Sequence, residues 1–260
     1  MTRFVRTHDY LYLNENRYQD PKQLHLEIID YIKFAESNDN NLNVSSILDA
    51  GCAAGEFAYL LNKKFSNTQI SGFDVLQELV NKARKEVLGV NFFEANILDS
   101  TAAEENSFDV VTCVGVLSIF DDFRDIISNL IHWTKPGGYV FIHSLFSDYP
   151  FDVRVQYNAS NDYGKGVLET GWNIFSKESI SAFLESVINR KSEEEGSGGG
   201  GGGLIESFVF YDFNIKRELE KKSDLIRSWT FYDERGDLKI TNGLNMLQPH
   251  AILQIRKSKN

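Results

Sequence analysis

Short apolar runs alternate with amphipathic stretches along the first 150 residues of this 260-residue chain. Five runs have the composition of buried strands: one ends near Leu48, and the others lie within residues 69–73, 90–95, 108–114 and 138–146. The last of these follows a Pro-Gly-Gly turn, and the stretches between the runs have helical patterns, as in residues 54–61 and 75–87. This alternation predicts an α/β fold. Residues 204–215 and 249–256 predict two more strands of the same sheet.

The loop after the first predicted strand is the most informative feature of the chain. Residues 47–55 read ILDAGCAAG, in which an apolar run ends at Asp49 and small residues follow. Gly51, Ala53 and Gly55 let the backbone come close to a ligand without a side-chain clash. A helix is predicted directly afterwards, so we expect a ligand between the carboxyl end of this strand and the N-terminus of that helix.

An acidic residue at the end of the second predicted strand fits the same kind of site. Asp74 comes 19 residues after Gly55, where a carboxylate can accept hydrogen bonds from both hydroxyls of a ribose. A small-residue loop with a downstream acid also describes a nicotinamide-dependent enzyme. These two features alone therefore leave the cofactor open.

Segments later in the chain narrow the choice of cofactor. VNFFEANILD follows at residues 90–99, FDVVTCVGVLSIFDDF at 108–123 and LIHWTKPGGYVFIHSLF at 130–146. In this order and spacing the chain resembles the class I S-adenosylmethionine (SAM)-dependent methyltransferases, over roughly residues 21–146 and more loosely to the C-terminus. A nicotinamide-binding loop would need G-x-G-x-x-G, which residues 47–55 do not supply. The resemblance implies a Rossmann-like doubly wound sheet, mostly parallel with an antiparallel last strand, and helices on both faces.

The resemblance also implies which residues hold SAM and its product S-adenosylhomocysteine (SAH). They are Asp49, Gly51, Ala53 and Gly55 at the methionine moiety, Asp74 at the ribose, Val75, Asn96 and Ile97 around the adenine, and Val114 and Gly115 beneath the cofactor. The chain departs from the family at Ala53, where glycine is frequent, and at Asn96, where aspartate is frequent. Ser118 and Ile119 stand where many relatives have Glu-His or His-His, so no catalytic histidine is carried over to them.

Three segments outside the common pattern are expected to complete the site. Residues 1–20 would form a lid, and residues 147–176 and 214–247 would be insertions that form the substrate pocket. The second insertion contains strand-like SWTFY and LKIT around the turn DERGD. The first supplies the substrate-binding candidates Tyr149, Arg154, Tyr157 and Trp172. Arg154 would anchor a phosphate or carboxylate through its planar fork. Alternatively it pairs with a surface acid, and the aromatic residues simply pack.

The histidines offer one candidate base. His143 ends the fifth predicted strand, where the crevice of such a fold opens, and the pKa of an imidazole lies near neutrality. His143 would therefore take the proton of a hydroxyl acceptor, unless it only bonds a loop. We expect His25, in a helical run, and His132 to be structural or exposed. His250 opens the last predicted strand without an evident partner.

Composition argues against several classes of protein. The net charge of −10 is unfavourable for binding nucleic acid through its phosphates. No apolar run is long enough to span a bilayer, and residues 1–18 lack the apolar core of a signal peptide, so we expect a cytoplasmic protein with no membrane partner. Cys52 and Cys113 are expected to be reduced and packed, since two thiols alone make a poor metal site. We expect no metal.

The glycine tract at residues 196–203 reads GSGGGGGG and has the composition of a flexible linker. It is either a mobile loop or an engineered linker in place of a disordered segment. The second interpretation is favoured because the tract has no side chains with which to act. It need not separate domains, and we expect residues 1–260 to form a single methyltransferase domain.

The sequence thus predicts an enzyme that moves the methyl group of SAM to an oxygen or nitrogen of a small polar metabolite, such as a sugar derivative. Such a transfer is an in-line displacement in which alignment supplies much of the acceleration. The alternatives are a protein or RNA methyltransferase, a non-catalytic SAM-binding regulator and a nicotinamide-binding oxidoreductase.

Overall fold

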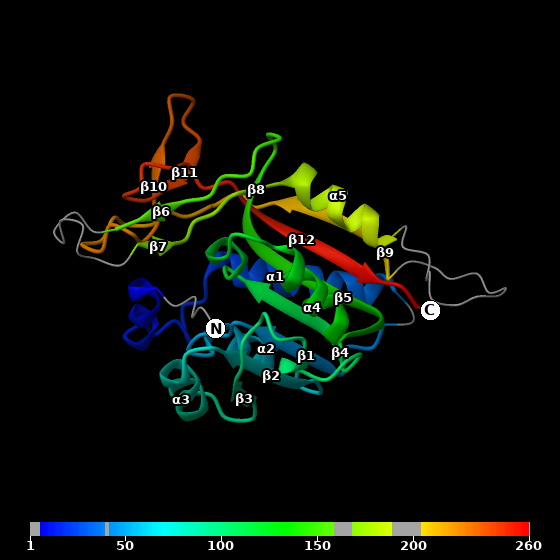
Figure 1. Cartoon of the computed structure of the whole chain (residues 1–260). Helices are drawn as coiled ribbons and strands as arrows, with labels where there is room; N and C mark the ends of the chain where they lie inside the picture. Colours follow the sequence, from blue (N-terminus) through cyan, green and yellow to red (C-terminus); the bar gives the residue numbers. More distant parts are fainter. Residues whose placement is uncertain (1–5, 40–41, 159–167, 189–203, 260) are drawn as a thin grey trace.

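The centre of the molecule is an eight-stranded sheet in the computed structural model, which describes residues 6–39, 42–158, 168–188 and 204–259 (Figure 1). Its strands are β1 (Ser46–Ala50), β2 (Gln69–Asp74), β3 (Asn91–Glu94), β4 (Phe108–Val114), β5 (Thr134–Ser147), β8 (Phe175–Ser176), β9 (Ile205–Asp212) and β12 (His250–Lys257). The order is β3-β2-β1-β4-β5-β12-β9, and β8 pairs with β5. Strands β1 to β5 pair in parallel, whereas β12 runs antiparallel to β5 and β9. The predicted sheet, with its antiparallel last strand, is confirmed.

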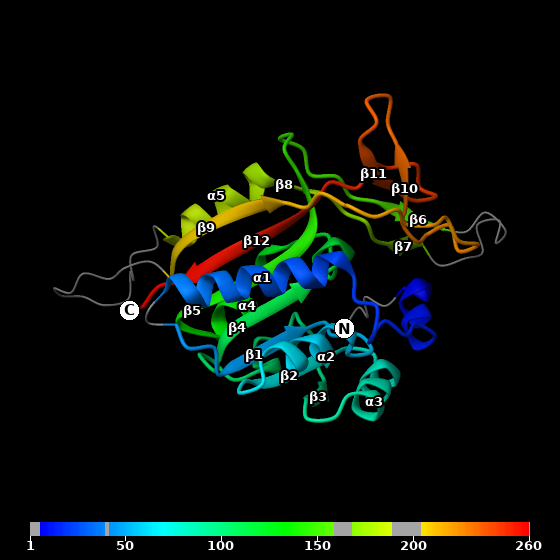
Figure 2. The ribbon, with the colours of Figure 1, turned by 180° about the vertical axis from the view of Figure 1, so that it is seen from behind.

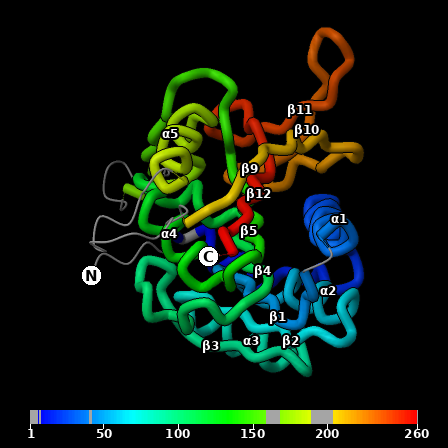
Figure 3. The backbone as a smooth tube through the Cα atoms, turned by 90° about the vertical axis from the view of Figure 1, so that its right-hand side faces the viewer, coloured from blue at the N-terminus to red at the C-terminus, as the bar shows by residue number. Residues whose placement is uncertain are grey.

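Helices cover both faces of this sheet, as predicted. They are α1 (Gln23–Asn38), α2 (Glu56–Lys64), α3 (Gln77–Glu86), α4 (Arg124–Trp133) and α5 (Lys177–Ile188). Figure 2 shows α1 and α2 in front of the sheet, and Figure 3 shows α1 and α5 on opposite sides of it. Ile28 and Ile32, four residues apart on α1, are fully buried in the core of one face. Ile127 of α4 and Leu184 of α5 are fully buried in the core of the other.

The strand order places a crevice at a defined point. Strand β1 pairs with β2 on one side and with β4 on the other, so the chain reverses its direction of travel across the sheet between β1 and β4. In open α/β sheets a ligand binds at such a switch point, outside the carboxyl ends of the strands.

Smaller elements complete the fold, and most of them lie at this end of the sheet. They are the 3-10 helices η1 (Thr7–Leu13), η2 (Ser100–Ala102) and η3 (Leu117–Ile119), and two hairpins, β6 (Gln156–Tyr157) with β7 (Glu169–Thr170) and β10 (Trp229–Tyr232) with β11 (Leu238–Thr241). Figures 1 and 2 both show η1 and the hairpins beyond the carboxyl ends of the parallel strands. The predicted strand pair of the second insertion is confirmed as β10 and β11. The glycine tract at 196–203 and residues 159–167 of the first insertion lie outside the described residues.

Two further observations concern expectations from composition. Cys52 and Cys113 are both buried and unpaired. Among the described residues, no helix combines the length and the apolar composition that a membrane crossing requires.

Candidate active site

A cavity of about 1130 Å³ opens at the carboxyl ends of the parallel strands. Nine of the ten residues that the resemblance assigns to the cofactor line it: Asp49, Gly51, Ala53, Asp74, Val75, Asn96, Ile97, Val114 and Gly115. Gly55, the N-cap of α2 with a φ of 80°, does not line the cavity. The structure therefore brings residues from four separate strand ends to one wall.

Hydrogen bonds join the loop after β1 to the end of β2. The backbone N–H groups of Gly51 and Cys52 both donate to the carbonyl of Phe73, each at 2.8 Å. The N–H of Ala53 donates to Oδ2 of Asp74 at 2.9 Å. This arrangement holds Ala53 at a φ of 47°, in the left-handed region that a side chain adopts at a cost of about 1–2 kcal/mol. Asp74 therefore shapes the loop and also faces the cavity.

The two glycines of the loop are required by protein packing. Gly51 and Gly55 have φ values of 82° and 80°. A Cβ on Gly51 would overlap the side chain of Val116, and one on Gly55 would lie 2.9 Å from the ring of Phe92. The sequence argument explained these glycines by the close approach of a ligand. That explanation is incomplete, because protein side chains already fill the space beside both positions.

Two carboxyl groups dominate the electrostatics of this wall. Asp49 is only 2% exposed, and burial raises its pKa to about 7, although the hydroxyl of Thr112 donates to its Oδ1 at 3.0 Å. Burial also raises the pKa of Asp74, against the effect of hydrogen bonds from the N–H groups of Leu76 and Ala53. A carboxylate has roughly four lone-pair positions, so Asp74 can still accept bonds from a ligand. A cation would favour the ionised form of Asp49.

The far end of the wall is less polar. Ile97 is buried, and its carbonyl accepts a hydrogen bond from the side-chain amide of Asn129 at 2.9 Å. Oδ1 of Asn96 accepts the N–H of Leu98 at 3.0 Å, which fixes the side-chain amide. Gly115 follows β4, and its N–H donates to the carbonyl of His143 at 3.0 Å. This end presents apolar surface beside a fixed amide, an environment that suits a flat heterocycle.

His143 lines the cavity, but its nitrogens are engaged or buried. It pairs with Val114 in the sheet, and β5 continues four residues beyond it to Ser147. Its Nε2 lies 2.9 Å from Nδ1 of His250, and the two rings are nearly parallel at 5°. Its Nδ1 is buried and has no hydrogen-bond partner among the described residues. Burial, with a smaller effect of His250, lowers the pKa of His143 well below the usual 6.5. His250, which had no evident partner in sequence, therefore contacts the candidate base.

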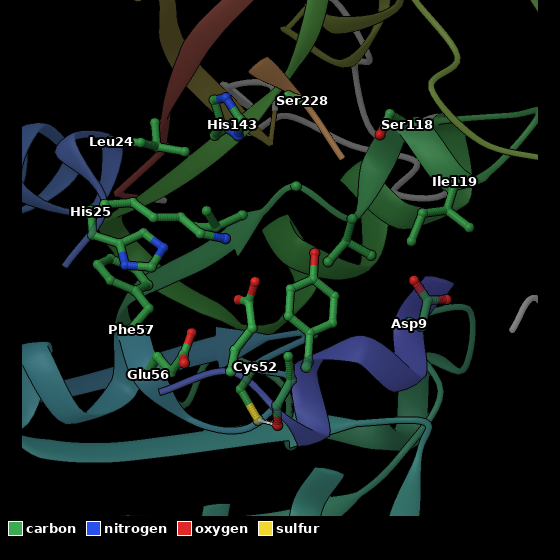
Figure 4. Close-up of a pocket in the computed structure, with 18 of the residues that line it drawn as sticks. Asp9, Leu24, His25, Cys52, Glu56, Phe57, Ser118, Ile119, His143 and Ser228 are labelled. Atoms are coloured by element: carbon green, nitrogen blue, oxygen red, sulfur yellow. Dashed lines mark hydrogen bonds between the residues drawn. The ribbon is translucent and has the colours of Figure 1, made fainter. Parts of the chain in front are cut away.

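His25 is a second histidine on the wall, and the sequence argument missed it. It lies in the first turn of α1, is 5% exposed and packs against Phe57 with 4.8 Å between ring centroids. Figure 4 shows its ring directed toward the cavity from the same side as Phe57. A buried ring packed against Phe57 is compatible with the structural role expected for His25, but no sequence feature indicated its place on the cavity wall. The amphipathic pattern of residues 23–38 contains no signal of it, because the cavity position depends on how α1 packs.

The substrate-binding candidates separate into two groups. Trp172 lines the cavity, whereas Tyr149, Arg154 and Tyr157 do not. The side chain of Tyr149 points to solvent, with 74% of the residue exposed. Nε of Arg154 donates to the carbonyl of Asp121 at 2.6 Å, and its guanidinium lies 4.8 Å from the ring centre of Phe175. The anchor role expected for Arg154 therefore has no support from its position, because these contacts hold it outside the cavity.

The described part of the N-terminal segment borders the cavity, and its role as a lid stays a prediction. Tyr12 lines the cavity, and Nζ of Lys82 on α3 donates to the carbonyls of Tyr12 and Leu13 at 3.0 and 2.9 Å. Glu15 pairs with Arg227 of the second insertion at 2.5 Å. The segment thus connects the cofactor side of the cavity with the second insertion. That insertion contributes to the wall Ile215, Arg217, Glu218, Leu219, Glu220, Lys222, Arg227, Ser228 and Ile240.

Comparisons with known proteins agree with this architecture. A family model described as a methyltransferase domain matches residues 18–187, so the chain belongs to this family, and its fold is that of the class I SAM-dependent methyltransferases. A ubiquinone biosynthesis O-methyltransferase from Hydrogenovibrio crunogenus is 31% identical over 125 residues, which cover 46% of this chain and 49% of the relative. The chain spans about half the length of the curated relatives it matches.

Solved structures extend the likeness over nearly the whole chain. A chain from a complex of the Haloferax volcanii Trm112 methyltransferase activator has a TM-score of 0.56 at 12% identity, and the match covers 98% of this chain and 99% of that one. A protein that converts a disulfide bond into a thioacetal group during echinomycin biosynthesis has a TM-score of 0.53 at 19% identity, with 97% and 92% covered. At these identities the likeness shows the fold alone.

Proposed function

We propose that this protein transfers the methyl group of SAM to an oxygen or nitrogen atom of a small polar molecule bound in the same cavity. One observation carries the proposal. In a chain of the methyltransferase family, Asp49, the loop residues 51–53 and Asp74 meet at the carboxyl ends of β1 and β2, on the wall of one large cavity.

The residues present fit SAM. Burial raises the pKa of Asp49, and no cationic side chain is among the causes that act on it. The sulfonium and ammonium groups of SAM would supply the positive charge that stabilises its carboxylate. Asp74 keeps lone pairs for the two ribose hydroxyls, and Ile97 with Val75 offers apolar contact to an adenine. When bound, SAM supplies an electrophilic methyl group.

The rest of the cavity supports a small acceptor. Its volume of about 1130 Å³ is slightly above the roughly 300–1,000 Å³ typical of small-molecule sites, which leaves room for a second ligand. Tyr12, Trp172 and the second insertion would exclude water from it and orient the acceptor, which is how a protein accelerates an in-line displacement. The matched relatives are named as O-methyltransferases, which favours a hydroxyl acceptor over an amine.

The test is to incubate the purified protein with SAM labelled in its methyl group and an extract of small metabolites. We expect a labelled small molecule and a matching amount of SAH, both identified by mass spectrometry. Binding of SAM without transfer to any acceptor would favour the regulator. Label in the protein or RNA fraction would favour the polymer-modifying alternative. Binding of a nicotinamide cofactor in place of SAM would support an oxidoreductase.

A further inference from the structure

His25 has a buried imidazole on the cavity wall that makes no hydrogen bond to any other described residue. It begins α1 together with Gln23 and Leu24, and Phe57 of α2 packs against its ring with 37° between the planes. In Figure 4 the ring lies beside Leu24 and Phe57 and is directed into the open space. This contact with Phe57 restricts the orientation of the ring.

Neither nitrogen of this ring is bonded to another group within the described part of the chain. Nδ1 is buried and has no hydrogen-bond partner there, and no hydrogen bond contributes to the pKa of the ring. A buried polar group without a partner costs about 1–3 kcal/mol, so such a group in a native protein calls for an explanation. That cost stays with Nδ1, whereas Nε2 is not among the buried unpaired atoms and is therefore the ring nitrogen that a ligand in the cavity can reach.

The comparison with His143 favours His25. Nε2 of His143 is held by His250 at 2.9 Å, and Nε2 of His250 lies 3.3 Å from Oε1 of Gln248, which also accepts the hydroxyl of Ser228 at 2.7 Å. Phe213 packs edge-on against both imidazole rings. A proton transferred to Nε2 of His143 would break this chain of contacts. His25 has no such contact to lose.

We propose that His25, and not His143, takes the proton of a hydroxyl acceptor during methyl transfer. This inference rests on the proposed function. The acceptor oxygen forms a bond to the methyl carbon while its O–H bond breaks, and the proton passes to Nε2 of His25. The electron pair of the methyl–sulfur bond stays on sulfur, which loses its positive charge, and His25 becomes the imidazolium. The acceptor hydroxyl therefore binds against the wall formed by α1 and α2.

The His25 ring is neutral before the reaction, and the causes that keep it neutral also disfavour the imidazolium that proton transfer forms, so the proposal rests on the position of Nε2. Burial lowers the pKa of His25 well below 6.5, and the positive charges of Lys22 and Arg17 lower it further. The N-terminus of α1 also disfavours a cation. The ring is therefore neutral at pH 7 and offers a lone pair.

The test combines variants with a chemical probe. His25→Asn and His25→Gln are compared with His132→Asn, a matched control in the last turn of α4 away from the cavity. Each is measured for SAH affinity by calorimetry and for methyl transfer from labelled SAM into the metabolite extract. In the parent chain, diethyl pyrocarbonate is used to acylate accessible neutral imidazole nitrogens, and the modified histidines are mapped by mass spectrometry.

We expect both His25 variants to lose about 10²- to 10⁴-fold in transfer rate, with SAH affinity within about twofold of the parent and the control unchanged. The reagent should modify His25 well before His143 and His250. Full transfer activity in a folded His25 variant, or modification of His143 ahead of His25, would overturn the proposal. The reagent experiment decides this even if both variants fail to fold. A parent chain that does not bind SAH would instead defeat the proposed function.

Discussion

Asp49 should make the binding of a cationic cofactor depend on pH. Its carboxyl group is buried at the carboxyl end of β1, and desolvation raises its pKa to about 7. SAM carries a sulfonium and an ammonium group, so it should bind the carboxylate and not the neutral acid. With this pKa the carboxylate fraction falls from about 90% at pH 8 to about 1% at pH 5, and the affinity should fall by about 90-fold, or roughly 2.7 kcal/mol.

Calorimetric titration of SAM at pH 5, 6, 7 and 8 measures this dependence. The Asp49→Asn variant keeps an oxygen that can accept the hydroxyl of Thr112 but does not titrate. We expect a fall of nearly tenfold between pH 6 and pH 5 in the parent, and a weak affinity without this slope in the variant. Circular dichroism at each pH checks that both proteins remain folded. A parent affinity that does not change with pH, or an equal slope in the variant, would remove Asp49 from the cofactor site.

Four further substitutions test other parts of the account. Asp74→Ala removes the acceptor for the ribose hydroxyls, so calorimetry should show SAH affinity lower by about 5- to 150-fold, and an unchanged affinity would refute the ribose assignment. Ala53→Gly relieves a left-handed backbone at φ 47°, but glycine also has greater freedom in the unfolded chain. Urea unfolding should therefore show a net gain of roughly 0–1 kcal/mol in the free energy of unfolding, and a loss would contradict the strain at Ala53. Burial lowers the pKa of His250 to about 4 from 6.5, so its stabilising effect is complete above pH 6.5 and is lost as pH falls toward 4. Urea unfolding should show that this loss, about 2 kcal/mol between pH 7 and pH 5, is absent from His250→Asn. Lys82→Met removes the donor to the carbonyls of Tyr12 and Leu13, so hydrogen exchange at residues 12–15 should accelerate, and unchanged protection would show that this contact does not hold the segment.

The fold was largely predictable because buried strands and amphipathic helices leave local patterns. The expected strands at 90–95 and 204–215 correspond to Asn91–Glu94 and Ile205–Asp212. Other features depend on contacts distant in sequence. The Pro-Gly-Gly turn before the fifth strand lies within β5, where its register against β4 shifts. The position of β12 between β5 and β9 also has no local signal, because strand neighbours are chosen by tertiary packing.

The candidate site also contains some residues that local sequence predicts and some contacts that it does not. Asp49 and Asp74 could be located because each lies at or next to the end of a predicted parallel strand, and such ends meet at one edge of a sheet. The contact of His143 with His250 could not, because it follows from a register in which His143 pairs with Ile252 and His250 with Leu145. Diagonal neighbours on one face of a sheet then come within reach of their rings.

The same limit applies to the acceptor side. The aromatic and cationic content of residues 147–176 indicated a binding segment, but composition does not determine which way a side chain points. Of the four candidates named there, Trp172 alone lines the cavity. His25 was missed for the converse reason, since a histidine in an amphipathic helix carries no local mark of the cavity beside it.

The central claim is that this cavity binds SAM and its product. Its most direct test is a calorimetric titration of the parent chain with SAH and, separately, with NAD. We expect SAH to bind at one site per chain and NAD to show no binding. Binding of NAD without binding of SAH would contradict it and would support the oxidoreductase alternative.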